Sequence, residues 1–509
     1  MSISTELPDD PGRTLRKQIY TLLIIAGAGI VLGRMAAVDS VSSIDLENYR
    51  RRQVPEELAK IRESLVERGV KGERLNRVLQ EKEAALLERA SLRRPFLSAN
   101  DRSRWCTIRA LVEPEMRVPG APYAIDKVLA ERGWDTIDMV MHDGHLYSSK
   151  PPLYPTLLAA EYWLIYNLTG ASLGTHPYAV GRFMLVTSNL LPLVLLWFVV
   201  AGLVERFGTT DWGRIFVVAA AVFGTFLSTF AIVINNHLMG AVFAGIAFFA
   251  AVPIWFDEDR RPRWFVLAGI AAAFTAANEL PALAFLAALG GALLLRFPKQ
   301  TLVAFVPGVL LVVVPFFATN WIAHRSLKPA YMHRVEGDNW YDYEYEINGR
   351  KVESYWRNPV GLDQGEDDTA VYAFHSLLGH HGVFSLTPMW VLTFVGLGMW
   401  LVRGPGRRIR ETALFIGVIS LVCLLFFTII EQKGRNYGGM SSGFRWVFWF
   451  APLWLVAMVP TVDWLAPRRW GRALALALLA LSILSVVYPI WNPWVHPWIY
   501  DAMVSWGWL

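Results

Sequence analysis

The sequence has few cysteines and few charges for its length. Only two cysteines, Cys106 and Cys423, occur among 509 residues, one in a polar segment and one inside an apolar run. Such a pair indicates neither a disulfide framework nor a metal site. Charged residues make up 18% of the chain, against about 25% in ordinary soluble domains. The loops also lack the glycine patterns that bind nucleotides, so nothing points to a nucleotide-dependent enzyme.

Apolar residues are correspondingly abundant, at 54% of the chain, and they gather in long continuous runs. A membrane-spanning helix needs about 20 such residues, whereas a barrel would show short alternating strands. We therefore predict an all-α polytopic membrane protein with about 11 transmembrane helices. The predicted spans are 18–38, 180–204, 214–234, 237–256, 263–277, 279–296, 301–322, 386–402, 411–430, 444–463 and 473–490.

The positive charges predict the orientation of these spans. The net charge of +5 could suit a nucleic acid, but many of the cations lie in short loops between apolar runs, where they set topology. Residues 1–17 and these loops are then cytoplasmic, and the C-terminus is outside. A cleaved signal peptide is the alternative for the first run, although no clear small-residue cleavage site follows it. The loop cations are Arg206, Arg260, Arg261, Arg263, Arg296, Lys299, Arg403, Arg407, Arg408, Arg410, Arg468, Arg469 and Arg472.

This orientation places two large loops outside the membrane. The first, residues 39–178, contains a predicted helical hairpin at about 50–94 and a polar segment at 98–155. The helices of spans 2–7 occupy 179–322, and the second loop covers 323–385. Alternation around Asn348-Gly349 predicts a short β-hairpin in that second loop. Spans 8–11 lie within 386–490, and the Trp-rich tail 491–509 is expected at the outer interface.

The segment 98–155 holds the first candidates for chemistry. Asp101 follows a polar stretch at the start of a predicted helix, where a carboxylate stays ionised and can serve as a general base. A simple helix N-cap is the competing interpretation. Lys150 precedes two prolines where the loop meets the membrane, at the height of lipid phosphates. A lysine that merely extends to the interface is the alternative there.

Other polar residues lie at the outer ends of spans. Asn236, His237 and Glu279 are candidates because polar and ionisable groups at membrane depth are costly, although asparagines also cap tight turns. Asp143 and His145 could suggest a metal, but a solvated loop explains them better, and we predict no metal site. His375 could face a substrate or simply lie at the interface.

Four motifs together give a resemblance to a known family. Asp101 and Arg104 come first, followed by a Gly-x-x-Tyr-x-x-Lys-Pro-Pro-Leu run from Gly144 to Leu153 that includes Tyr147 and Lys150. Later segments are Gly-Val-Phe-Ser-Leu-Thr-Pro at 382–388 and Tyr-Gly-Gly at 437–439, followed by Gly-Phe-Arg-Trp at 443–446. The set resembles the GT-C glycosyltransferases, closest to the protein O-mannosyltransferases and the bacterial lipid A aminoarabinose transferase type.

The resemblance implies a GT-C-like bundle in the cytoplasmic membrane with an extracytoplasmic active site. It implies inverting transfer of a sugar from a polyprenyl-phosphate donor to an envelope lipid, glycan or protein. Asp101 would be the base, while Lys150, Arg445 and Arg104 would hold the phosphate. The resemblance implies no cofactor, since the lipid-linked sugar is a substrate, and it leaves dependence on a divalent metal open. Further substrate-binding candidates are Asp143, His145, Tyr147, Asn236, His237, Glu279, His375 and Tyr437.

Other functions compete with this interpretation. A lipid-linked oligosaccharide ligase or polymerase would use similar lipid phosphates. A transporter would show internal repeats and charges near the middle of the membrane, and the sequence shows no convincing repeat. A non-enzymatic envelope-assembly protein is a further alternative. The expected partners are a polyprenyl-phosphate sugar donor, an envelope lipid, glycan or protein acceptor, and membrane lipids, but not nucleic acid.

Overall fold

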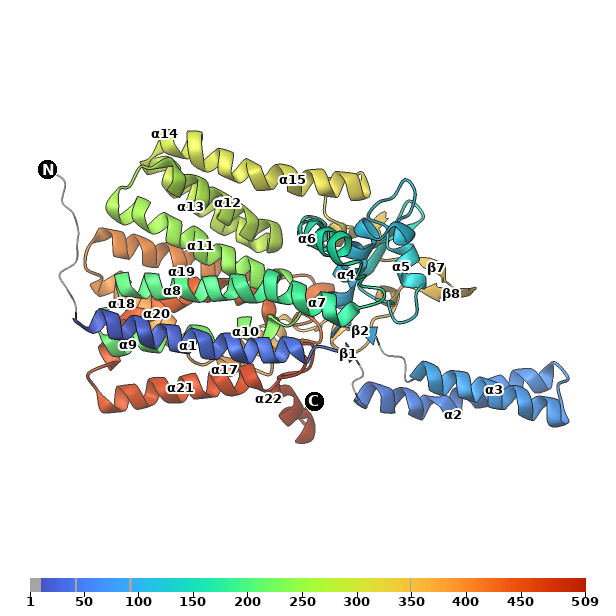
Figure 1. Ribbon diagram of the computed structural model, residues 1–509. Coiled ribbons are helices and arrows are strands. Elements are labelled where there is room, and N and C mark those ends of the chain that lie inside the picture. Colours follow the sequence, from blue (N-terminus) through green and yellow to red (C-terminus); the bar gives the residue numbers. More distant parts are fainter. Residues whose placement is uncertain (1–10, 42–43, 91–93, 348) are drawn as a thin grey trace.

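A bundle of long apolar helices forms most of the molecule, with a smaller polar domain at one end (Figure 1). The computed structural model describes residues 11–41, 44–90, 94–347 and 349–509. Within these residues, eight helical stretches are long and apolar enough to cross a membrane. The all-α polytopic class predicted from the sequence is therefore confirmed. The eight stretches are Gly12–Ala36, Pro177–Phe207, Asp211–Phe230, Asn236–Asp257, Pro298–His324, Arg407–Thr428, Arg445–Leu465 and Arg469–Val487.

The remaining predicted spans coincide with shorter helices. Two of these, Leu280–Arg296 and Trp390–Arg403, are apolar, and the third corresponds to the 17-residue helix α12. The bundle consists of α1 (Pro11–Ala36), α7 (Pro177–Leu185), α8 (Leu191–Phe207), α9 (Asp211–Phe223), α10 (Leu227–Phe230), α11 (Asn236–Asp257), α12 (Pro262–Asn278), α13 (Leu283–Arg296), α14 (Pro298–Gln300), α15 (Val306–His324), α18 (Trp390–Arg403), α19 (Arg407–Thr428), α20 (Ala451–Leu465) and α21 (Arg469–Val487).

The bundle has a packed centre and an apolar exterior. Helices α11 and α20 are largely buried, whereas the stretch Pro298–His324 is apolar and mostly not buried within the protein. Leu302, Val303 and Leu311 on this stretch are 58%, 64% and 64% exposed. Apolar surface of this extent is stable in lipid rather than in water.

Close helix packing depends on two glycines at one crossing. A Cβ added at Gly269 of α12 would lie 2.3 Å from the Phe305 carbonyl oxygen, and one at Gly308 of α15 would lie 2.6 Å from the Val266 carbonyl oxygen. The backbones of α12 and α15 can approach this closely because both positions lack a side chain.

The polar domain lies at the end of the bundle to the right in Figure 1 and combines segments of both long loops. The second loop contains the predicted β-hairpin, in which Ile347 pairs with Arg350; Asn348 of its turn lies outside the described residues. The first-loop elements are α4 (Ala99–Val112), α5 (Asp126–Ala130), β3 (Met139–His142), β4 (His145–Ser148) and α6 (Leu153–Thr169). Those of the second loop are β5 (Arg334–Val335), β6 (Asp338–Asn339), β7 (Glu344–Ile347), β8 (Arg350–Glu353), α16 (Thr369–Leu377) and α17 (Val383–Leu386), and the tail contains α22 (Trp498–Ser505).

A helical arm extends from the polar domain (Figure 1). It consists of α2 (Ile44–Glu67) and α3 (Gly72–Ala90), which pack along each other. At its base, β1 (Ser40–Val41) pairs antiparallel with β2 (Arg94–Pro95). The two chain segments that enter and leave the arm therefore lie side by side.

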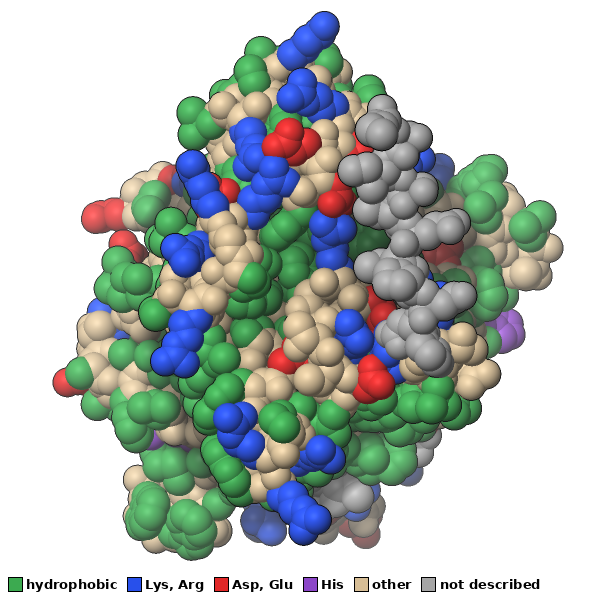
Figure 2. Space-filling model, turned by 90° about the vertical axis from the view of Figure 1, so that its left-hand side faces the viewer, with side chains coloured by type: hydrophobic (Ala, Val, Ile, Leu, Met, Phe, Trp, Pro, Cys, Tyr) green, Lys and Arg blue, Asp and Glu red, His purple; other side chains and the backbone are tan. Residues whose placement is uncertain are grey.

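Lys and Arg side chains gather at the opposite end of the bundle, where short connections join the helices (Figure 2). This is the end that the positive-inside rule predicts to be cytoplasmic. The polar domain would then face the outside, with both long loops in it.

Candidate functional site

Helix α4 positions the first candidate residues and is almost entirely buried. Its N-cap is Ser98, whose side chain accepts a hydrogen bond from the Asp101 backbone N–H. At the other end, Arg109 pairs with Glu113, and Tyr162 of α6 donates to the same carboxylate at 2.6 Å. The helix is therefore fixed between its cap and α6, and the side chains along it are held in place.

Asp101 lies against a break in the bundle. The chain between α10 and α11 is not helical, and Asp101 Oδ1 accepts a hydrogen bond from the Ile234 N–H of this segment at 2.9 Å. Asn189 donates to the Ala231 and Val233 carbonyl oxygens of the same segment, at 2.8 Å each. Non-helical backbone at this depth needs such partners.

Burial changes the acidity of Asp101. Only 1% of the residue is exposed, and burial raises the pKa of the carboxyl to about 7, although the Ile234 N–H and the positive charge of Arg104 oppose the change. A carboxyl with this pKa exchanges protons near neutral pH.

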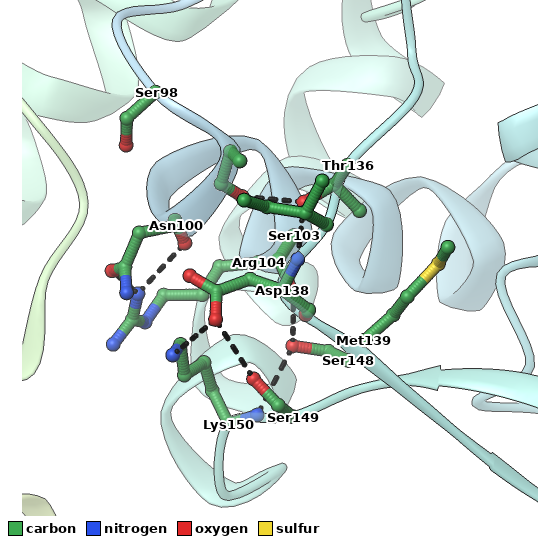
Figure 3. A network of polar contacts seen from close by, with 12 residues as sticks. Ser98, Asn100, Ser103, Arg104, Thr136, Asp138, Met139, Ser148, Ser149 and Lys150 are labelled. Carbon is green, nitrogen blue, oxygen red and sulfur yellow. Dashed lines mark hydrogen bonds and ion pairs between the residues drawn. The ribbon is translucent and has the colours of Figure 1, made fainter. Parts of the chain in front are cut away.

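A β-hairpin brings a second carboxylate to a candidate cation. Strands β3 and β4 pair so that Met139 lies opposite Ser148, which places Asp138 and Lys150 beside each other at the open end. Lys150 Nζ lies 2.9 Å from Asp138 Oδ1 (Figure 3). Ser149 N–H donates to the Asp138 carbonyl oxygen at 3.1 Å, so the pairing continues past the strands.

Arg104 connects α4 with the bundle. It donates to Asn100 Oδ1 at 2.7 Å on its own helix (Figure 3) and to Asn236 Oδ1 at 2.7 Å at the start of α11. Asn236 in turn donates to Glu279 Oε1 at 2.9 Å. Three predicted site residues from three elements are thus joined by hydrogen bonds.

Glu279 continues this chain to Arg445 through His237. The His237 Nδ1 atom hydrogen-bonds Glu279 Oε1, and Arg445 lies 2.8 Å from His237 Nε2. Because an arginine can only donate, Nε2 accepts and the ring proton lies on Nδ1, directed at Glu279. Arg445 also donates to the Gly438 carbonyl oxygen at 2.9 Å. The imidazole is therefore neutral and fixed in one tautomer.

The positive charges of this region influence one another. Burial lowers the pKa of Lys150 to about 8; Asp138 opposes the change, whereas Arg104 and Arg445 add to it. Burial by itself would raise the pKa of Asp138, but Lys150 and Arg104 outweigh it, and the net pKa is lowered. Asp138 is therefore an ionised partner for the three cations.

Arg104 and Lys150 line one small cavity together with Tyr154, Asn236 and Asn278. Its volume is about 20 Å³, which is room for a single water molecule. A phosphate group would need the side chains around this cavity to move apart.

The predicted candidates Asp143 and His145 lie at the tip of the β3–β4 hairpin, away from this cavity. Asp143 and Gly144 form its two-residue turn, with φ of 48° and 77°, and the Asp143 side chain is 71% exposed. His145 lies next to Asp126, at 3.6 Å. Tyr147 is buried on β4 with its ring against His324.

His375 and Tyr437 belong to a separate aromatic cluster. The His375 ring stacks on His380 at 4.0 Å, and His381 stacks on Tyr437 at 5.2 Å. Burial lowers the pKa of His380 to about 3, and neighbouring histidines add to this effect. Within the residues that the structure describes, no three His, Cys, Asp or Glu side chains are arranged to hold a metal ion.

Asp138 is the main site residue that the sequence analysis missed. A signal was present, because Asp143-Gly144 between alternating residues is a strong indication of a two-residue hairpin. In a hairpin with this turn, Met139 pairs with Ser148. The register therefore brings Asp138 close to Ser149 and Lys150.

Comparison with known proteins gives limited information. No protein-family model matches the chain, and no curated protein matches it. Among solved structures, it is similar to a crystal structure of the Archaeoglobus fulgidus oligosaccharyltransferase in complex with Zn and sulfate, with a TM-score of 0.40 and 14% identity. The match covers 80% of this chain and 55% of that one, so the chain spans about half the length of that protein. A likeness at this TM-score does not support an argument about chemistry.

Proposed function

We propose that this protein is a membrane glycosyltransferase that transfers a sugar from a polyprenyl-phosphate donor to an extracytoplasmic acceptor. The observation that carries the proposal is the grouping of Arg104, Lys150 and Arg445 with Asp138 where the polar domain meets the apolar bundle. Cations at that depth suit a phosphate whose chain lies in the membrane.

The cations would hold the donor phosphate and stabilise the negative charge it gains as the sugar departs. Such stabilisation is strongest away from water, and burial lowers the pKa of Lys150 while Asp138 keeps it charged. Arg445 is oriented by Gly438 and His237, so its remaining N–H groups have a fixed direction. A phosphate leaving group needs little protonation, and no separate acid is required.

Asp101 is the proposed general base, and its acidity supports this role better than that of Asp138. A base with a pKa near 7 accepts a proton readily at neutral pH, whereas the lowered pKa of Asp138 makes it a weaker base. Asp138 would instead keep Lys150 charged and positioned. Because Asp101 is buried, the segment 231–235 would move to admit the acceptor hydroxyl.

The experiment is mass spectrometry of lipids that co-purify with the protein in three forms: wild type, Asp101→Asn and Glu115→Gln. Glu115 is an exposed carboxylate of the same loop, so its variant controls for loss of charge. Enrichment of a polyprenyl-phosphate sugar in Asp101→Asn would identify the donor and support Asp101 as the base. Bulk phospholipid alone in all three forms would count against the transferase.

A further inference from the structure

A large apolar cavity lies at the other end of the bundle, among α11, α13 and α19. Its volume is about 790 Å³, within the range of ligand sites. The walls between the helices are mostly apolar, and small side chains on two helices leave the space open: Ala251 on α11, and Ala288 and Ala292 on α13.

The cavity opens toward lipid as well as toward the end of the bundle. Leu295, Leu414 and Val418 line it and are 90%, 56% and 48% exposed. Side chains of this type at an opening between helices contact hydrocarbon rather than water. An apolar chain can therefore enter from the side.

Three arginines and one glutamate line the mouth of the cavity: Arg296, Arg407, Arg408 and Glu411. Arg407 donates to Glu411 at 2.6 Å. Arg296 and Arg408 both pair with Glu258, a neighbour at the C-terminal end of α11. The three arginines carry three positive charges, and Glu411 and Glu258 carry two negative ones. The group therefore has a net charge of +1. This end of the molecule carries many of the Lys and Arg side chains visible in Figure 2.

We propose that this cavity binds an anionic glycerophospholipid, with its acyl chains between α11, α13 and α19 and its phosphate at the arginines. The single net negative charge of such a headgroup would neutralise the net positive charge of this group, whereas a zwitterionic headgroup has no net charge. Basic pockets between transmembrane helices at the cytoplasmic side suit acidic headgroups. The site differs from the proposed donor site, which lies with the polar domain at the opposite end, and it does not depend on the proposed function.

The test uses full-length protein reconstituted in nanodiscs that contain equal amounts of phosphatidylglycerol and phosphatidylcholine. After mild extraction into detergent, native mass spectrometry measures how much of each lipid remains bound. We expect the wild type to retain phosphatidylglycerol in preference, and Arg408→Gln to lower that preference about fivefold, since each cation near the surface contributes about that factor.

Two variants separate binding from folding. Glu411→Gln should raise the preference for phosphatidylglycerol, a gain that a folding defect does not produce. The control is Arg469→Gln, which removes an exposed cation outside the cavity and should leave the preference unchanged. Ala292→Trp should reduce retention of both lipids by filling the space. Equal retention of the two lipids by the wild type, unchanged preference in Arg408→Gln and Glu411→Gln, or bound polyprenyl phosphate in place of phosphatidylglycerol would overturn the proposal.

Discussion

Lys150 Nζ lies 2.9 Å from Asp138 Oδ1 although the two residues are 12 positions apart in the chain. The hairpin β3–β4 causes this contact, because its register places both residues at the open end. The cation that the sequence analysis assigns to phosphate binding therefore has a carboxylate partner within the protein. A phosphate would have to compete with Asp138 for it.

The Asp138–Lys150 pair should show strong coupling in stability. Asp138→Asn or Lys150→Met alone leaves one largely buried charge without its ion-pair partner at 2.9 Å, which costs about 3–5 kcal/mol. The double variant removes both charges and should recover most of the loss. Thermal unfolding of the four proteins in one detergent measures the coupling. As a control, Glu56→Gln removes an exposed ion pair on the arm and should change the midpoint of thermal unfolding little. Additive losses in the Asp138→Asn/Lys150→Met double variant would contradict the prediction.

Asp101 should make transfer depend on pH near neutrality. Its pKa of about 7 means that the carboxylate becomes protonated below that pH, so transfer should fall about tenfold for each pH unit lost. Initial rates between pH 5 and 9 check this. A flat profile across this range would exclude Asp101 as the base.

The same group should also affect stability, and in the opposite direction. The folded protein binds the Asp101 proton more tightly than the unfolded chain, whose ordinary pKa is 3.8. Its contribution to the free energy of unfolding is full below about pH 4 and is lost as pH rises through about 7. Asp101→Asn keeps an oxygen for the Ile234 N–H and lacks this dependence. Wild-type stability relative to the variant should therefore fall between about pH 4 and 7 and level off above that; parallel curves would contradict the shift.

Arg445→Lys should impair transfer although it keeps the charge. The arginine donates to Gly438 and His237 at the same time, and a lysine cannot reproduce that geometry. Loss of one oriented donor at a developing negative charge lowers kcat by about 10²-fold. Steady-state kinetics with a purified donor measures the change. Arg435→Lys, at a cation that binds loop carbonyl oxygens, is the matched control; similar kinetics for both variants would argue against the assigned role.

Gly269→Ala should weaken the packing of α12 on α15. Its methyl group would meet the Phe305 carbonyl oxygen at 2.3 Å, and forced separation of packed elements costs about 1–3 kcal/mol. Gly291→Ala is the control, because a Cβ there meets nothing within 4 Å and alanine favours helix. We expect a lower unfolding midpoint for the first variant and an equal or higher one for the second.

The sequence predicted the bundle better than the site. Continuous apolar runs specify membrane helices because every backbone group must be paired inside lipid. Each predicted span coincides with a helical stretch, although the stretch predicted at 214–234 ends at Phe230, before the non-helical segment that contacts Asp101. Asn236, His237 and Glu279 are sequence candidates as polar residues at membrane depth, whereas Arg104 and Arg445 come from the family resemblance. Nothing in the sequence indicates the hydrogen bonds that join the five residues. Those contacts depend on how α4, α11, the end of α12 and the segment before α20 are placed in space, which periodicity does not encode.

Asp138 illustrates the same limit at short range. Its partner is decided by hairpin register, and register follows from the turn Asp143-Gly144 rather than from the residue's immediate neighbours. The sequence analysis considers Asp143 only as a possible ligand or a solvated loop residue, and Gly144 only as part of a motif, so it misses the pairing that this turn imposes.

The antiparallel pair β1–β2 closes the base of the arm, so the arm can be removed from the chain as a unit. Ser40 faces Pro95, so the arm is an insertion whose ends already meet, and a turn of a few residues could replace the 24- and 19-residue helices between them. At about 1.5 Å per residue, the longer helix reaches about 36 Å from that base. The arm, and with it any contact made at its tip, can therefore be replaced or changed in length without altering the path of the chain through the bundle.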